Sequence, residues 1–148
     1  MFGKRSKTQH LIEISKLSSL IADDVEIVGD IRFASGLRID GTLRGSAVGQ
    51  PGEGKTHSLL VVSDKGRVEG TIRCYDAVIN GTVEGELDVE HFLELQPNAR
   101  VSGTIRYSSL QMEVGAMVDG RLEQRDSNAP RATVVDLGSE KEKARNAG

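Results

Sequence analysis

A glycine that returns at nearly regular intervals constrains the fold of this 148-residue chain more than any other sequence feature. Successive glycines are 16, 25, 15, 18 and 17 residues apart: Gly29, Gly45, Gly70, Gly85, Gly103 and Gly120. Apolar residues stand two positions before and after each of them, and eleven of the twelve directly adjacent residues are polar or charged. Val68-Glu69-Gly70-Thr71-Ile72 shows the pattern most plainly. An alternation of period two indicates strands with one side buried, and the longer period of roughly 17 residues indicates a repeat architecture.

The length of the repeat selects the architecture. A unit of roughly 17 residues is too short for a strand-helix-strand unit, and no helical period appears inside it. It fits one coil of a parallel β-solenoid, in which apolar side chains point inward and coils stack about 4.8 Å apart. The sequence therefore predicts an all-β, single-domain β-helix of about six coils, a rod roughly 25 to 30 Å long.

Two further features locate the corners of the coil. Small residues mostly occupy the position four before each repeating glycine, where we expect a sharp corner with glycine at positive φ: Val25, Gly41, Gly66, Gly81, Ala99 and Ala116. The interval of 25 residues contains a polar, glycine-rich excess over residues 49–57, which we interpret as a loop extruded from one corner.

Arg73 and Arg106 are 33 residues apart, about two coils, so we expect them on one outer face without direct contact.

Composition excludes several classes of protein. The net charge is -3 and no basic groove is interleaved with aromatic residues, so we expect no nucleic-acid binding. Three Phe, two Tyr and no Trp predict a core of small and β-branched side chains. The lone Cys74 has no partner for an intrachain disulfide, and no secretory signal or apolar run of about 20 residues is present. These features indicate a cytosolic protein that contacts a membrane only at its surface.

One segment matches a catalytic signature. Residues 49–56 read G-x-x-x-x-G-K-T, the phosphate-binding P-loop. That chemistry needs a helix directly after the loop, so that amide groups at its N-terminus face the phosphates. Here Thr56 precedes a β-type run, Leu59 to Val62, and Pro51 lies inside the loop. The segment is therefore not expected to bind nucleotide.

The remaining chemistry-bearing residues do not suggest an active site. His10, His57 and His91 are dispersed without ligand spacing, so no metal site is expected. Cys74 stands where sister repeats have Phe33 and Tyr107, which favours apolar packing over a nucleophilic role. We expect no catalytic residues, no cofactor and no enzymatic activity.

Several phrases of the sequence together resemble the bactofilins, a bacterial family of polymer-forming cytoskeletal proteins. They are Ser19-Leu20-Ile21, Gly29-Asp30-Ile31, Leu37-Arg38-Ile39-Asp40-Gly41-Thr42-Leu43-Arg44-Gly45, Gly81-Thr82-Val83-Glu84-Gly85, Ala99-Arg100-Val101-Ser102-Gly103 and Gly115-Ala116-Met117-Val118-Asp119-Gly120, together with the Met-Phe-Gly-Lys start. The resemblance covers about residues 19 to 122. It implies a right-handed, triangular β-helix that assembles through its two ends, without nucleotide, into nonpolar filaments that scaffold cell-shape and cell-wall factors.

The ends of such a rod are the candidate polymerisation interfaces, because each terminal coil leaves backbone N–H and C=O groups unpaired. At the C-terminal end the candidates are Leu110, Met112, Val114, Met117, Val118 and Leu122. At the N-terminal end they are Leu20, Ile21, Val25, Ile27 and Ile31. Related bactofilins carry an aromatic residue, important for assembly, near the middle of the closing motif, where this chain has Met117.

The first seven residues are the candidate membrane contact. Met1 and Phe2 are apolar, and Lys4, Arg5 and Lys7 could meet anionic headgroups, each contributing about 1 kcal/mol. The resemblance supports this interpretation, since the family's Met-Phe peptide is associated with membrane attachment; the alternative is a disordered, solvated start. Leu11, Ile14 and Leu17 recur at helical spacing, so residues 8–18 are either a short amphipathic helix or a lead-in strand.

We therefore expect a flexible N-terminal tail over residues 1–18, a β-helix over 19–124 and a disordered tail over 125–148. The expected function is a cytoskeletal scaffold that polymerises with itself at the cytoplasmic side of the inner membrane, with cell-wall enzymes or other scaffold clients as possible partners. One alternative is a non-polymerising β-helix adaptor that binds partners along its faces. A second alternative, a β-helix transferase, needs a hexapeptide period and a pocket histidine, neither of which fits.

Overall fold

Twelve β-strands and no helix make up the part of the chain that the computed structural model describes, residues 17–50 and 57–125. The strands are β1 (Ser19–Ile21), β2 (Glu26–Val28), β3 (Ile31–Phe33), β4 (Gly36–Ile39), β5 (Thr42–Arg44), β6 (Ala47–Gly49), β7 (Leu59–Val62), β8 (Arg67–Ile79), β9 (Thr82–Leu95), β10 (Arg100–Tyr107), β11 (Ser109–Met112) and β12 (Met117–Gln124).

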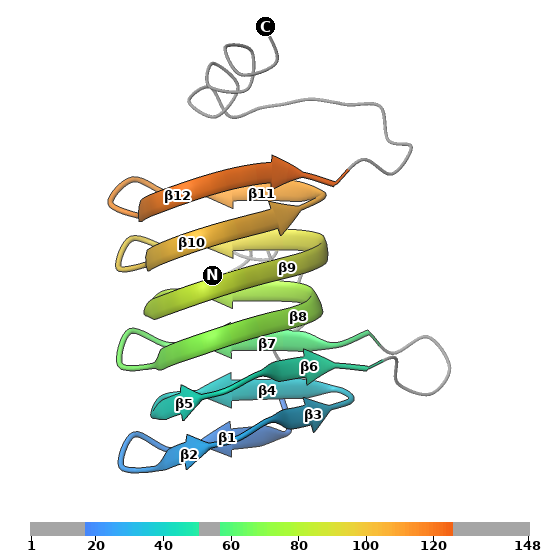
Figure 1. Cartoon of the computed structure of the whole chain (residues 1–148), viewed down its shortest axis with the longest axis vertical. Helices are drawn as coiled ribbons and strands as arrows, with labels where there is room; N and C mark the ends of the chain where they lie inside the picture. Colours follow the sequence, from blue (N-terminus) through green and yellow to red (C-terminus); the bar gives the residue numbers. More distant parts are fainter. Residues whose placement is uncertain (1–16, 51–56, 126–148) are drawn as a thin grey trace, which may run out of the picture.

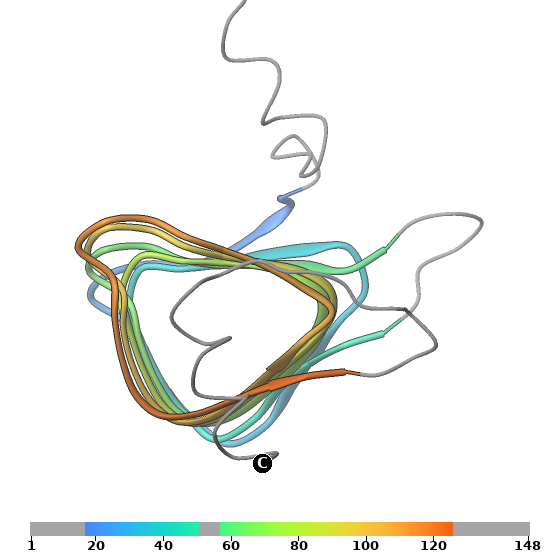
Figure 2. The same ribbon diagram turned by 90° about the horizontal axis from the view of Figure 1, so that it is seen from above.

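The strands wind into six stacked coils in which every strand pairing is parallel (Figure 1). In Figure 1 the chain climbs while crossing the front from left to right and the back from right to left, which is a right-handed turn. Seen from above, the coils superimpose as a triangle (Figure 2). The predicted β-solenoid of about six coils is confirmed, together with the handedness and outline that the resemblance implied.

The triangle has three faces, which we name in chain order. The first face contains β1, β4, β7, residues 76–79 of β8, residues 92–95 of β9, and β11. The second contains β2, β5 and residues 67–69, 82–84, 100–102 and 117–119 of the longer strands. The third contains β3, β6 and residues 71–74, 86–89, 104–107 and 121–124.

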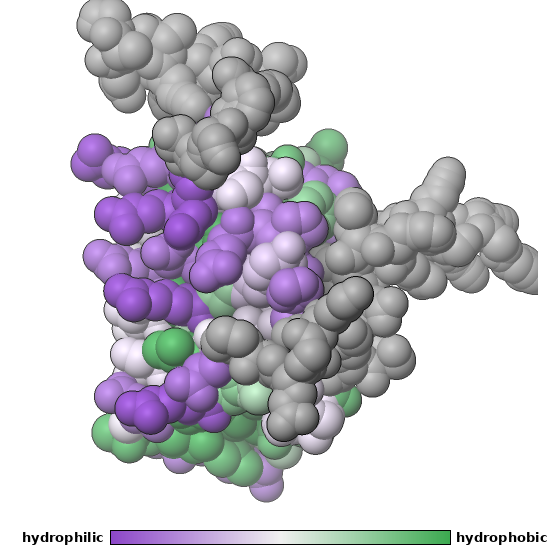
Figure 3. Space-filling model, turned by 90° about the vertical axis from the view of Figure 1, so that its right-hand side faces the viewer, coloured by the Kyte–Doolittle hydropathy of each residue, from purple (hydrophilic) through white to green (hydrophobic). Residues whose placement is uncertain are grey.

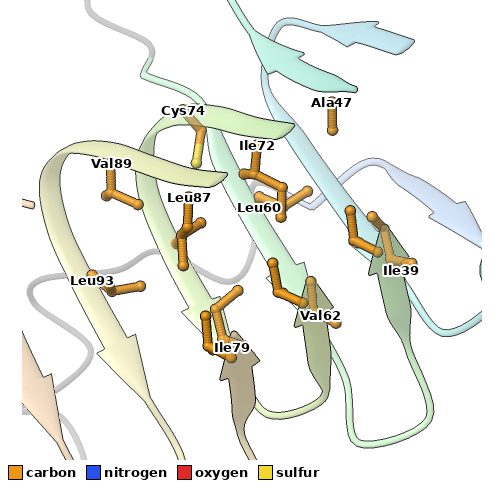
Figure 4. Packing of buried hydrophobic residues seen from close by; sticks show 14 of the residues in the cluster. Ile39, Ala47, Leu60, Val62, Ile72, Cys74, Ile79, Leu87, Val89 and Leu93 are labelled. Atoms are coloured by element: carbon orange, nitrogen blue, oxygen red, sulfur yellow. The ribbon is translucent and has the colours of Figure 1, made fainter. Parts of the chain in front are cut away.

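The core fills the inside of the triangle with the apolar residues of the alternating pattern. Val68 and Ile72, on either side of Gly70, are both fully buried, as predicted. Figure 4 shows side chains such as Leu60, Val62 and Ile72 pointing into the common interior from successive strands. Each fully buried Val, Leu or Ile contributes about 1.5 to 3 kcal/mol through the hydrophobic effect. Cys74 is buried in the same cluster, which confirms its packing role.

The repeating glycines form the corner between the second and third faces. All six have positive φ; that of Gly70, for example, is +151°. We expected glycine at positive φ four residues earlier, and that prediction was wrong: Gly41, Gly66 and Gly81 of that second column do not have a positive φ. Gly66 is needed there for a different reason, because a Cβ atom on it would lie 2.3 Å from the carbonyl oxygen of Ile39 in the preceding coil.

The corner between the first and second faces varies in length. In four coils it has four residues and is closed by a backbone hydrogen bond, such as that from Gly66 N to Ser63 O (2.8 Å). In the second and fourth coils only Asp40-Gly41 and Asn80-Gly81 separate the strands. These differences produce much of the irregularity in the spacing of the repeating glycines.

The corner between the third and first faces carries the extra residues of the second coil. Strand β6 ends at Gly49 and β7 begins at Leu59, and residues 51–56 of the predicted loop lie outside the described residues. On the third face, Arg73 pairs in register with Asp88, which pairs in register with Arg106. The two arginines therefore share one face two coils apart, as predicted.

Candidate polymerisation surfaces

The C-terminal end of the rod is an open strand edge. Strand β12 pairs with β10 only, and β11 pairs with β9 only, so each has one side without a strand partner within the described chain. Strand β12 contributes eight residues to this edge and β11 contributes four. Unpaired backbone N–H and C=O groups in extended strands readily accept a further strand.

The apolar layer beneath that edge is incompletely covered. Leu110, Val118 and Leu122 are only partly buried and pack against the core, and Met112, in register with the fully buried Leu95, is exposed. Inward side chains of the central coils are fully buried because another coil lies above them. A second apolar surface placed on this end would therefore bury the last layer.

The structure does not bring all six predicted C-terminal residues into that layer. Val114 lies in the last corner and is 93% exposed. Met117 is in register with Arg100 and is 58% exposed, on the outside of the second face. These two residues border the open layer, whereas the other four form it.

The N-terminal end is a shorter edge. Strands β1, β2 and β3 have three residues each and, within the described residues, pair only with β4, β5 and β6, respectively. Ile27 and Ile31 form a partly buried layer against the core. Figure 3 shows apolar surface gathered along the lower end of the molecule, which this first coil forms.

The other predicted residues of this end differ in exposure. Leu20 and Val25 are exposed, whereas Ile21 is buried among core side chains. The prediction for this end did not include Val28, which is 76% exposed and is among the most exposed large apolar residues in the described chain. The sequence carried its signal, because Val28 is the one apolar residue among the twelve that directly flank the repeating glycines.

The outer side of the second face, in contrast, carries paired charges. On the second face, Arg44 Nε lies 2.6 Å from Glu26 Oε2, and Arg44 Nη1 lies 2.8 Å from Glu69 Oε1. Arg67 continues the ladder, with Nε 2.7 Å from Glu69 Oε2 and Nη2 2.8 Å from Glu84 Oε2. The hydrogen bond from Arg67 lowers the pKa of Glu69, which keeps this carboxylate ionised. Exposed ion pairs add little stability, but here they give the charged side chains of this face partners of opposite charge.

The residues considered for catalysis lie in other places. The P-loop-like segment is followed by strand β7, with no helix between Thr56 and Leu59. The rings of His57 and His91, which we described as dispersed, stack on either side of Tyr75, with centroid distances of 3.9 and 4.8 Å. No group of three or more potential metal ligands occurs among the residues described. Burial raises the pKa of the Cys74 thiol, which keeps it protonated.

The membrane candidates Met1, Phe2, Lys4, Arg5 and Lys7 lie outside the described residues. Within the described part of the chain, no helix is long and apolar enough to cross a membrane.

Comparison with known proteins identifies the family. A family model for bactofilins, described as polymer-forming cytoskeletal proteins, matches residues 19–123, more than half of the chain. A search of curated proteins found no match. The fold is similar to a bactofilin from Thermus thermophilus, solved by cryo-EM as double helical filaments, with a TM-score of 0.62 and 30% sequence identity. That match covers 73% of this chain and 100% of the other. The chain therefore belongs to the bactofilin family of polymer-forming cytoskeletal proteins.

Proposed function

We propose that this chain assembles end to end into filaments through the two open ends of its rod. The observation that carries the proposal is that both terminal coils combine a strand edge that has no partner among the described residues with an incompletely buried apolar layer. The ends are the places where one more coil would satisfy both the backbone and the core. The filaments of the similar Thermus thermophilus protein support this mode of assembly.

The filament is nonpolar, with like ends meeting, and it forms without nucleotide. The two ends differ in the length of their edges, three residues per strand at one end and up to eight at the other. When two N-terminal ends or two C-terminal ends meet, the strand edges that face each other have the same length. The segment that resembles a P-loop lacks the helix that phosphate binding needs, which supports assembly without nucleotide.

The filament serves as a scaffold rather than an enzyme, bound to the inner face of the cytoplasmic membrane through Met1, Phe2, Lys4, Arg5 and Lys7. Two large apolar residues and three cations suit a weak interfacial anchor, and many such anchors on one polymer act together. Its clients are cell-shape or cell-wall factors. Absence of catalysis is consistent with the structural role of the family.

Light scattering of the purified full-length chain, with and without ATP or GTP, tests this proposal. We expect strong scattering in both conditions and filaments by electron microscopy. A protein that stays monomeric under both conditions would instead be an adaptor, and scattering that needs nucleotide would contradict nucleotide-independent assembly.

A further inference from the structure

The outer side of the first face is buried, although it points away from the core. In β7, β8 and β9, fully buried core residues such as Leu60, Ala77 and Leu93 alternate with residues on the opposite side of the sheet. On that opposite side lie Leu59, Val61, Val78 and Phe92, which we call the outer strip. Leu59, Val78 and Phe92 are only 3%, 7% and 7% exposed.

The outer sides of the other two faces provide the comparison. There the corresponding positions carry Arg73, Glu84, Glu86 and Arg106, all exposed to solvent. The outer strip forms its own apolar cluster, separate from the main core. A buried apolar cluster on the outside of a solenoid indicates a site that another segment covers.

The described chain begins beside this strip. Leu17 packs against the cluster of Leu59, Val78 and Phe92. Ser18 N donates a hydrogen bond to Gly36 O (3.4 Å), and Gly36 is in register with Leu59. Because Gly36 has no side chain, Leu17 can reach Leu59 across it. The sixteen residues that precede Leu17 therefore enter the fold next to the apolar surface.

An acidic side chain lies beside the outer strip. Glu94 lies beside Val78, in the same outward column, and is 6% exposed. Gln96 Nε2 donates a hydrogen bond to Glu94 Oε2 (3.1 Å), and the carboxyl group of Glu113 forms a hydrogen bond with that of Glu94. No ion pair involves either carboxyl group within the described residues. Residues 8–16 contain one cation, Lys16, directly before Leu17, and one acid, Glu13.

We propose that residues 8–16 dock on the outer strip of their own subunit, with Leu11 and Ile14 continuing the contact that Leu17 begins. Residues 8–16 are long enough to extend along the outer strip. Three coils cover about 14 Å along the axis, and nine residues span about 14 Å as a helix. The spacing of Leu11, Ile14 and Leu17 places them on one side of such a helix. The docked segment carries the N-terminal peptide to the flank of the rod and leaves both ends free.

A disulfide cross-link in the full-length chain tests this placement. In a Cys74→Ala background, we expect Ile14→Cys and Val61→Cys to form an intramolecular disulfide on mild oxidation, seen by mass spectrometry of non-reduced peptides. The matched control, Ile14→Cys with Thr71→Cys on the third face, is expected to form none. An intermolecular disulfide with Val61→Cys would assign the strip to a second copy of the chain and overturn the proposal, as would equal yields in the two pairs.

Trypsin cleavage after Lys16 supplies a second measurement, in which no residue of the β-helix is substituted. Docking protects this bond, so Leu11→Asp with Ile14→Asp should speed its cleavage at least tenfold in full-length protein. Gln9→Asp, a charge change in the same segment, serves as the control and should leave the rate unchanged. If the double variant is cleaved at the wild-type rate, the segment does not dock through these residues and the proposal fails.

Discussion

A Cβ atom on Gly70 would lie 2.0 Å from the carbonyl oxygen of Gly45, directly beneath it in the preceding coil. The same contact recurs along the column up to Gly120, whose Cβ atom would lie 1.8 Å from the carbonyl oxygen of Gly103. Gly29, in the first coil, shares the positive φ but has nothing within 4 Å of that position. Glycine is therefore required at this corner for two separate reasons: the positive φ in every coil, and the lack of space for a Cβ atom in every coil after the first.

These two glycines give a matched pair of variants. Gly29→Ala should lower the free energy of unfolding by about 1 to 3 kcal/mol, the range for a strained backbone. Gly70→Ala adds a clash between two backbones and should be destabilised considerably more, because the coils must separate. Urea unfolding followed by circular dichroism measures both, and equal midpoints would show that φ alone makes glycine necessary.

A charge in the open C-terminal layer should block assembly at that end. Met112→Arg places a cation in the exposed inward position of the last coil, and Met117→Arg places one at its border. We expect both variants to lose filaments by electron microscopy while keeping a β-rich circular dichroism spectrum. Thr104→Arg, on the side of the fifth coil, should still polymerise. Filaments formed by both end variants would mean that this end makes no contact.

The size of the blocked species distinguishes filament polarity. In a nonpolar filament the N-terminal ends still pair, so Met112→Arg should sediment as a dimer. In a head-to-tail filament the same change removes every contact and leaves monomers. Analytical ultracentrifugation separates the two, and monomers would refute the nonpolar arrangement.

Deletion of residues 1–7 should release the protein from membranes without affecting assembly. The deleted peptide carries the three cations and two apolar residues proposed to bind the interface, together worth about 3 kcal/mol from charge alone on an anionic surface. Co-sedimentation with vesicles containing anionic lipid measures the loss, and vesicles of neutral lipid are the control. Unchanged pelleting with anionic vesicles would place the membrane contact elsewhere.

The carboxyl group of Glu113 should make stability depend on pH. Burial, followed by the hydrogen bond to Glu94, raises the pKa of Glu113 above its usual value. The folded state therefore holds this proton more tightly than the unfolded state, so its contribution is full below a pH of about 4.3 and is lost as pH rises through the raised pKa.

Replacing Glu113 by Gln removes this titration. We expect Glu113→Gln to gain stability relative to the wild type as pH rises from 4 to 7, in urea unfolding experiments at each pH. Glu86→Gln, an exposed position on the third face, is the matched control. A wild-type pH dependence in Glu113→Gln would mean that the proton on Glu113 has no effect on folding.

The repeat could be predicted from sequence because alternation of period two survives every irregularity of the coil. Leu37 lies eight residues before its repeating glycine, as Ile21 does, yet the two occupy different inward columns: Leu37 is in register with Ser19, and Ile21 with Ile39. The second coil has a corner two residues shorter, and a change of two residues preserves which side is inward. Counting back from the repeating glycines therefore finds inward residues, but it does not identify which of them are neighbours in adjacent coils.

Features that depend on contacts between coils could not be predicted in this way. The run Leu59 to Val62 is apolar throughout, and only strand register shows that Leu59 and Val61 face outward. Similarly, Tyr75 is near neither His57 nor His91 in sequence, and one corner brings the three rings together. The positive φ of the repeating glycines follows from the turn between two faces, which sequence spacing does not distinguish from the preceding corner.

The connection between Gly49 and Leu59 adds residues to the chain without making the rod longer. Strands β6 and β7 resume normal pairing on either side of the added residues, so the insertion contributes no rise along the axis. The subunit's length along a filament is set by its six coils, about 29 Å at roughly 4.8 Å per coil. Residues can therefore be added or removed at this corner without changing the axial repeat of the polymer or the match between its ends.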